Sequence, residues 1–137
     1  MKKMVSILLM AALLAGISTA QTDGSSVDTV ILASTENYPD ALMAGSAASK
    51  LGAPVLLTDK GEIPEETESL LQEMGPEEVF IIGGPAVVSE EVEEALKQSY
   101  NVTRLWGTTR YGTSVEVAEY FWVEGSDEAI IVQDNLG

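Results

Sequence analysis

Short runs of apolar and β-branched residues constrain this fold more than any other feature of the sequence. Residues 27–34, 53–58 and 78–82 contain VILA, PVLL and VFII, without the polar alternation of a half-exposed strand. Continuously apolar strands are typical of a parallel sheet that helices cover on both faces. The sequence therefore predicts a three-layer α/β domain with a mostly parallel, open, Rossmann-like sheet.

Strand patterns and helix patterns alternate along the chain. The expected strands are 27–34, 53–58, 78–82 and 101–106, and the expected helices are 40–51, 65–74, 89–99 and 113–122. The run AIIV at 129–132 predicts a fifth strand. Turns that follow parallel strands gather along one edge of the sheet, where open α/β sheets usually bind ligands. Here those turns are 35–39, 59–63, 83–88 and 107–112.

The first twenty residues have the pattern of a secretory signal. Lys2 and Lys3 precede an apolar run, and small residues lead up to Ala20, so we expect cleavage before Gln21. The alternative is an uncleaved membrane anchor, which is disfavoured because the apolar run is shorter than the ~20 residues that a bilayer requires. The expected organisation is a signal at 1–20, a linker at 21–26, a module at 27–123, and at 124–137 a linker with the first strand of a second, truncated repeat.

Composition excludes several classes of function. Seven Lys and Arg oppose 22 Asp and Glu, for a formal net charge of −15. Neither nucleic acid nor an anionic membrane is expected as a partner, because phosphate binding requires clustered basic residues. The absence of cysteine and histidine excludes Ser-His-Asp and Cys-His catalysis, and thiolate or imidazole metal sites. We expect no cofactor, and only oxygen ligands, suited to calcium or magnesium, remain for any metal.

Two patterns at strand ends have structural interpretations. Asp40 is expected to cap the first helix, while Asn37 and Tyr38 beside it present a polar, stackable surface. Gly83 and Gly84 lack both the GxGxxG spacing and a P-loop lysine, so they predict a tight turn and not a nucleotide site.

The stretch WGTTRYGTSVEVA, at 106–118, contains one of the two arginines. Thr113 and Glu116 fit a capping box, which predicts a helix start near Thr113 with Arg110 just outside its amide end. Arg110 then either helps to bind an anion or pairs with a nearby carboxylate. The residues leave both interpretations open, for Arg110 and for Arg104 in the strand before it.

Three blocks of sequence, in this order, resemble the type 2 cell-wall-binding repeat of bacterial and archaeal surface proteins. They are VILASTENYPDALMAGSAASKLGAPVLLTD, VFIIGGPAVVSEEVEEAL and RLWGTTRYGTSVEVA, and they span about residues 28–121. The resemblance implies an α/β module, usually in three tandem copies, that attaches non-covalently to anionic cell-wall polymers and has no known enzymatic activity. Both arginines fall within the family pattern.

The strand-end positions and the resemblance together define candidate ligand-binding residues. They are Asn37, Tyr38, Asp40, Arg110, Tyr111, Thr113 and Ser114. We expect a secreted, non-catalytic module at the cell surface or cell wall that binds a wall or surface polysaccharide. Cleavage of the signal leaves five basic and 22 acidic residues, a formal charge of −17, so divalent cations or high salt are expected to assist the binding of an anionic polymer.

Two other functions are open on the sequence. The domain is alternatively an assembly element that packs against sister repeats in a surface-layer protein, or, third, a carboxylate-dependent hydrolase of wall polymers. The carboxyl end, DEAIIVQDNLG, echoes DTVILASTENY about a hundred residues earlier. This echo indicates either the start of a second, truncated repeat or a strand that completes the first module.

Overall fold

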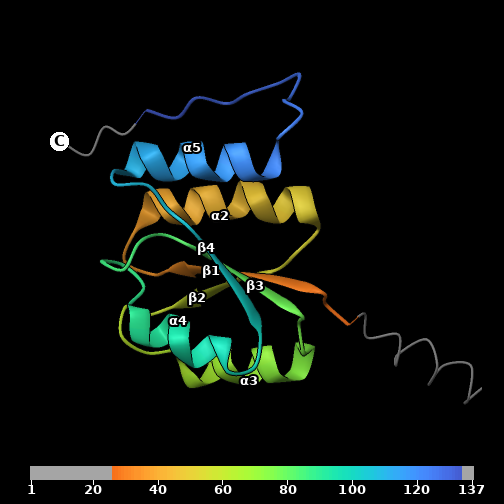
Figure 1. Ribbon diagram of the computed structural model, residues 1–137, viewed down its shortest axis with the longest axis vertical. Coiled ribbons are helices and arrows are strands. Elements are labelled where there is room, and N and C mark those ends of the chain that lie inside the picture. The colour runs from red at the N-terminus through yellow and green to blue at the C-terminus, as the bar shows by residue number, and fades with distance from the viewer. Residues whose placement is uncertain (1–25, 134–137) are drawn as a thin grey trace, which may run out of the picture.

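The protein is described by a computed structural model over residues 26–133, in which four strands and four helices alternate (Figure 1). The expected signal at 1–20 and its cleavage point lie outside the described residues. The elements are β1 (Thr29–Ser34), α2 (Tyr38–Leu51), β2 (Val55–Thr58), α3 (Glu65–Met74), β3 (Glu78–Ile82), α4 (Glu90–Lys97), β4 (Asn101–Leu105) and α5 (Arg110–Phe121). In this part of the chain, no helix is both long and apolar enough to cross a membrane.

The four strands form one parallel sheet in the order β2-β1-β3-β4. Ile31 in β1 lies opposite Val55 in β2 and Phe80 in β3, which places β1 and β3 at the centre of the sheet. Both central strands are almost entirely buried, because helices cover the two faces. The predicted three-layer α/β architecture is confirmed.

Successive residues of each central strand point into different cores. Ile31 and Phe80 pack with the alanines of α2 and with Val117 of α5 on one face. Leu32 and Ile81 pack with the apolar side chains of α3 and α4 on the other face. Figure 1 shows the same layers, with α2 and α5 above the sheet and α3 and α4 below it. Burial of each large aliphatic side chain contributes about 1.5–3 kcal/mol, which explains why the strands tolerate no polar alternation.

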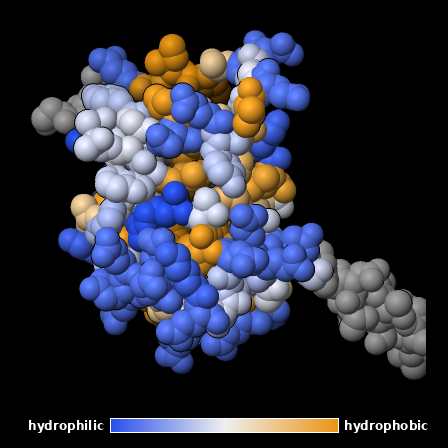
Figure 2. All heavy atoms as spheres, viewed as in Figure 1, coloured by the Kyte–Doolittle hydropathy of each residue, from blue (hydrophilic) through white to orange (hydrophobic). Residues whose placement is uncertain are grey.

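Acidic residues cover the outer surfaces of α3 and α4, where Figure 2 shows mostly hydrophilic side chains. The two α helices α2 and α3 end at Gly52 and Gly75, which adopt φ of +64° and +55°. Glycine reaches this left-handed conformation without the strain that a Cβ would introduce. These two stops fall where the sequence predicted them.

The predicted fifth strand is wrong. Residues 129–132 are exposed and form no sheet ladder; Figure 1 places them on the far side of α5 from the sheet. An apolar run becomes a strand only when a neighbouring strand satisfies its backbone groups. Ile130 and Ile131 are 91% and 95% exposed, and Figure 2 shows apolar side chains gathered over this segment. Whether the segment begins a further repeat stays a prediction.

Candidate functional site

The carboxyl ends of the strands and the amino ends of the helices share one edge of the molecule, which we call the carboxyl edge (left in Figure 1). Hydrogen bonds connect the loops that follow β1, β2 and β3. The Thr35 hydroxyl donates to Asp59 Oδ1 over 3.1 Å, and the Ser89 amide donates to the Lys60 carbonyl over 2.8 Å. The loops after β1, β2 and β3 therefore support one another.

Helix α2 begins before Asp40, so the predicted cap at Asp40 is wrong. Its N-cap is Asn37, with Pro39 in the first turn, and the Asn37 side chain makes no cap hydrogen bond to the helix backbone. Instead, Asn37 Nδ2 donates to Asp40 Oδ2. Because proline supplies a helical φ at the first positions, the helix starts earlier than the acidic residue suggests. Tyr38, the first helical residue, is 68% exposed.

The Asp40 carboxylate lies in the interior of the carboxyl edge. The residue is 3% exposed, and burial raises the pKa of its carboxyl group, while the hydrogen bond from Asn37 opposes this shift. Gly83 follows β3 with φ of +121°, and a Cβ there would lie 2.8 Å from Asp40 Oδ2 and 2.7 Å from Val87 Cγ2. Asp40 thus lies against the backbone that follows β3, and Gly83 leaves room for it.

Arg104 is a structural residue. Its side chain is 7% exposed and pairs with Glu93 at 2.6 Å between Nε and Oε2. The guanidinium also donates to the carbonyl oxygens of Gly83, Val88 and Ser89, over 2.9, 2.9 and 3.2 Å. Of the two interpretations that the sequence left open for Arg104, the carboxylate pair is therefore the one that the structure shows. The Arg104 guanidinium therefore holds the loop between β3 and α4 against β4.

The Glu93 carboxylate forms ion pairs with Arg104 and Lys97. Burial by itself would raise the pKa of its carboxyl group, but hydrogen bonds from Arg104 and Lys97 outweigh burial and lower it. Lys97 lies 3.0 Å from Glu93 Oε1 on the exposed side, one helical turn away. Both oxygens of Glu93 are thus paired, which keeps the carboxylate ionised beside the buried arginine.

Helix α5 begins at Arg110, and the predicted capping box at Thr113 and Glu116 is wrong. The N-cap is Thr109, whose hydroxyl accepts a hydrogen bond from the Gly112 amide over 3.1 Å. Thr113 lies inside the helix, 4% exposed, and its hydroxyl accepts from the Gly107 amide over 3.1 Å. Thr113 therefore fixes the β4–α5 loop and is not available to a ligand.

A glycine pair explains this earlier helix start. A Cβ on Gly107 would lie 2.3 Å from the carbonyl carbon of Gly112, so the loop touches the first turn of α5 backbone to backbone. Arg110 and Tyr111 occupy the exposed side of that turn, and Tyr111 is 69% exposed. The Ser114 hydroxyl, one turn later, donates to the Tyr111 carbonyl over 2.7 Å. Arg110 is therefore part of the helix and not just outside it.

The amino ends of the four described helices differ in charge. The first turns of α3 and α4 each carry three glutamates, and that of α2 carries Asp40. The first turn of α5 carries no acid and begins with Arg110. Free amide groups at a helix start attract anions, and carboxylates in the first turn neutralise that attraction. Among these helices, the start of α5 is thus the most favourable place for a negative or electron-rich group.

The Gly83–Gly84 turn uses its own backbone groups. The amides of Val87 and Val88 donate to the Gly84 carbonyl, over 3.0 and 3.1 Å. These bonds agree with the tight turn that the sequence predicts. Within residues 26–133, no group of three acidic side chains is arranged to hold a metal ion.

Trp106 was not among the candidate site residues predicted from the sequence. It follows β4 directly and is 45% exposed, on the same edge as Tyr38 and Tyr111. Its position at the end of a predicted strand, just before Gly107, was the feature of the sequence that could have identified it as a candidate. The edge therefore presents three exposed aromatic side chains, while Asp40 and Thr113 support it from within.

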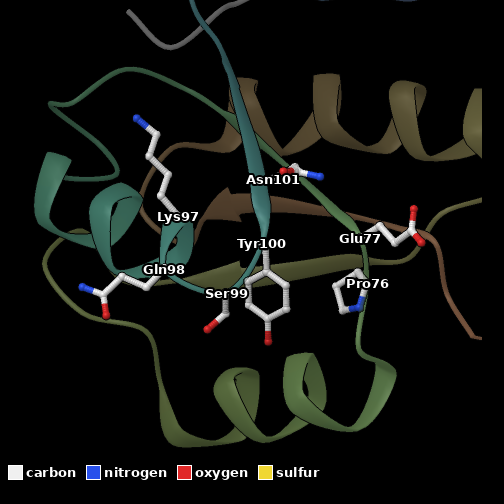
Figure 3. A pocket seen from close by; sticks show the side chains of 7 residues that line it. All are labelled: Pro76, Glu77, Lys97, Gln98, Ser99, Tyr100 and Asn101. Carbon is white, nitrogen blue, oxygen red and sulfur yellow. The ribbon is translucent and has the colours of Figure 1, made fainter.

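A shallow depression of about 470 Å³ lies at the opposite edge, where α3 leads into β3 and α4 leads into β4 (Figure 3). It is lined by Pro76, Glu77, Lys97, Gln98, Ser99, Tyr100 and Asn101. None of the candidate site residues borders it. Parallel sheets bind ligands at the carboxyl ends of their strands, so position in the fold favours the carboxyl edge over this depression.

Comparisons with known proteins agree with the fold. The chain is 38% identical over 106 residues to the "Amidase enhancer" of Bacillus subtilis, and 32% identical over 96 residues to its "N-acetylmuramoyl-L-alanine amidase LytC". The matches cover 77% and 69% of this chain but 15% and 19% of those proteins. The chain therefore spans less than a fifth of the length of these relatives.

A solved structure and a family match identify the domain. Cwp6 from Clostridium difficile superposes with a TM-score of 0.64 at 33% identity, covering 69% of this chain and 16% of that one. Residues 7–93 match the Cell wall binding domain 2 (CWB2) family. This match covers more than half of the chain and ends within α4, before helix α5, which begins at Arg110. The chain belongs to the Cell wall binding domain 2 family.

Proposed function

We propose that this chain is a secreted, non-catalytic cell-envelope module that binds a wall or surface polysaccharide non-covalently through its carboxyl edge. Membership in a cell wall binding family supports a wall polymer as the partner. The observation that carries the choice of surface is the start of α5, where Arg110 and Tyr111 are exposed beside a helix end without acidic residues. Tyr38 adds a second exposed ring on the same edge.

The charge of the chain opposes the binding of an anionic polymer. Three acidic residues are exposed in the loops of the carboxyl edge: Glu36, Asp59 and Glu62. The exposed basic residues at this edge are Lys60, in a loop, and Arg110, at the start of α5. Divalent cations between these carboxylates and an anionic polymer would reverse the repulsion, and salt would screen it. The proposal therefore includes binding that calcium or salt strengthens.

Co-sedimentation with purified cell walls tests this proposal. Arg110→Ala should weaken wall binding about tenfold, because the variant removes an exposed cation from the start of α5. Lys50→Ala removes a cation from the last turn of α2, at the opposite edge, and should leave binding unchanged. If the unaltered protein stays in the supernatant with calcium, with chelator and at high salt, the proposed function is wrong. A lower melting temperature with unchanged binding would instead make Arg110 a loop-stabilising residue.

The alternative function is assembly, in which the domain packs against sister repeats of a surface-layer protein. It is favoured by the exposed apolar side chains that follow α5, at Val123, Ile130, Ile131 and Val132. Sedimentation velocity of the unaltered protein and of an Ile130→Glu, Ile131→Glu variant discriminates. Self-association that the two glutamates abolish, without affinity for walls, would support assembly; a monomer that binds walls would exclude it.

A further inference from the structure

Trp106 is exposed on one side and packed against backbone on the other. Its six-membered ring lies against Gly84: a Cβ on Gly84 would be 2.7 Å from Cε3 and 3.2 Å from Cδ2. No residue other than glycine fits at position 84 without moving the ring. The turn beneath it is itself fixed, because the Gly84 carbonyl accepts hydrogen bonds from two amides, those of Val87 and Val88. One side of the indole is thus seated on backbone while 45% of the residue faces solvent.

The backbone that follows Trp106 is fixed by contacts with α5. Gly107, the next residue, touches the first turn of α5 and donates its amide to Thr113 Oγ1. This contact connects Trp106 with the turn that carries Arg110 and Tyr111. An aromatic side chain fixed before binding loses little conformational entropy when a ligand covers it.

The chemistry of the surroundings selects the part of a polymer that such a ring can bind. The chain carries a formal charge of −15, so phosphate or carboxylate groups experience repulsion at long range. An indole face instead suits the apolar C–H face of an uncharged sugar ring, through dispersion and contact with the electron-rich π system. Salt does not weaken this contact, unlike a contact between charges.

We propose that Trp106 is a sugar-stacking residue, seated on Gly84, that binds a neutral pyranose ring of the wall polymer. Tyr111, in the first turn of α5, is a second exposed aromatic side chain on the carboxyl edge. This inference rests on the proposed function and specifies which chemical group the carboxyl edge recognises. Arg110 then contributes a polar contact beside the stacked ring, and the overall negative charge discriminates against segments with closely spaced anions.

Wall co-sedimentation of Trp106 variants at 0.1 M and 1 M NaCl tests the inference, with purified cell walls as the probe. Trp106→Ala should weaken binding about tenfold, and Trp106→Phe should stay within about threefold because it keeps a ring. Binding by the unaltered protein should persist at 1 M NaCl. Tyr120→Ala is the matched control: Tyr120 is 47% exposed, near the carboxyl end of α5, and its removal should not change binding.

The outcomes separate the two proposals. If the unaltered protein binds walls and Trp106→Ala binds equally well, stacking is wrong while the proposed function stands. Loss of binding at 1 M NaCl would also overturn stacking, because charges would then carry the affinity. If the unaltered protein does not bind walls under any condition, the proposed function itself is wrong.

A second measurement keeps Trp106 in place and therefore does not depend on whether Trp106→Ala folds. Trp122→Phe leaves Trp106 as the only tryptophan, so its fluorescence reports on this position alone. Addition of walls should shield that tryptophan from acrylamide quenching by about twofold or more. Unchanged quenching with bound walls would overturn the inference.

Discussion

Replacing Arg104 by methionine should destabilise the fold severely. The change preserves much of the side-chain volume but removes all four hydrogen bonds that the guanidinium makes, to Glu93 and to three carbonyl oxygens. Removal of one partner from a buried ion pair destabilises by about 3–5 kcal/mol, since the other charge stays without its partner. The Glu93 side chain is 17% exposed and keeps its bond to Lys97, so we expect about 3 kcal/mol.

Urea unfolding of the purified protein, followed by far-ultraviolet circular dichroism, measures this loss. The midpoint should fall while the slope of free energy against urea stays constant. Lys97→Met is the control, because it removes the exposed partner of the same carboxylate; exposed pairs contribute up to about 1 kcal/mol. Adding Glu93→Leu to Arg104→Met should recover part of the stability by removing the unpaired charge. An Arg104→Met variant within about 1 kcal/mol of the unaltered protein would refute the structural role.

Three further predictions concern the support of the carboxyl edge. Burial raises the pKa of Asp40, so its ionisation opposes folding, and stability falls as pH rises through the raised value. Asp40→Asn should therefore gain stability relative to the unaltered protein as pH rises above the ordinary pKa of an aspartate, about 4; a difference in unfolding free energy that does not change with pH would contradict the assignment. Gly107→Ala should destabilise by at least about 3 kcal/mol, because its Cβ would meet the backbone of Gly112, whereas Gly45→Ala, in open space within α2, should stabilise by about 0.5–1 kcal/mol. Thermal unfolding of the two glycine variants checks this, and shifts of the same sign and size would be inconsistent with the packing. Thr109→Ala should lose about 0.5–2 kcal/mol with the α5 cap, and an unchanged melting temperature would assign the cap elsewhere.

The layers of this fold could be predicted because burial on both sides leaves a strong mark on a sequence. Ile31 and Leu32 are adjacent yet enter different cores, and only a strand covered on both faces requires two apolar neighbours of this kind. The run at 129–132 has the same composition and is not a strand. Local composition cannot tell whether a partner strand is present, so the two segments look alike before the fold is known.

The starts of α2 and α5 were predicted about two and three residues too late, for a shared physical reason. Asp40 and Thr113 are good capping residues by type, but both lie inside the first turns and are buried. Their positions depend on contacts from other strands or loops, with Gly83 in one case and Gly107 in the other. Single-sequence patterns describe neighbours along a helix and miss such contacts.

The exposure of Trp106 was equally hard to predict. Trp106 was predicted as the last residue of the strand 101–106, but β4 ends at Leu105, which is 6% exposed. The seat that keeps the ring at the surface is Gly84, which comes from a different strand end. Tyr38 was predicted to present a stackable surface, and it is exposed; Tyr111, a candidate ligand-binding residue, is exposed as well, because each stands in the first turn of a helix at the edge of the sheet.

Hydrogen exchange with and without saturating purified wall polymer tests the central claim, that binding occurs at the carboxyl edge. Amide exchange should be slower in the loop at 35–37 and from Trp106 to Ser114 when polymer is bound. Exchange at the depression from Lys97 to Asn101, on the opposite edge, should stay the same. Slower exchange at the depression, with no change around Trp106, would contradict the account.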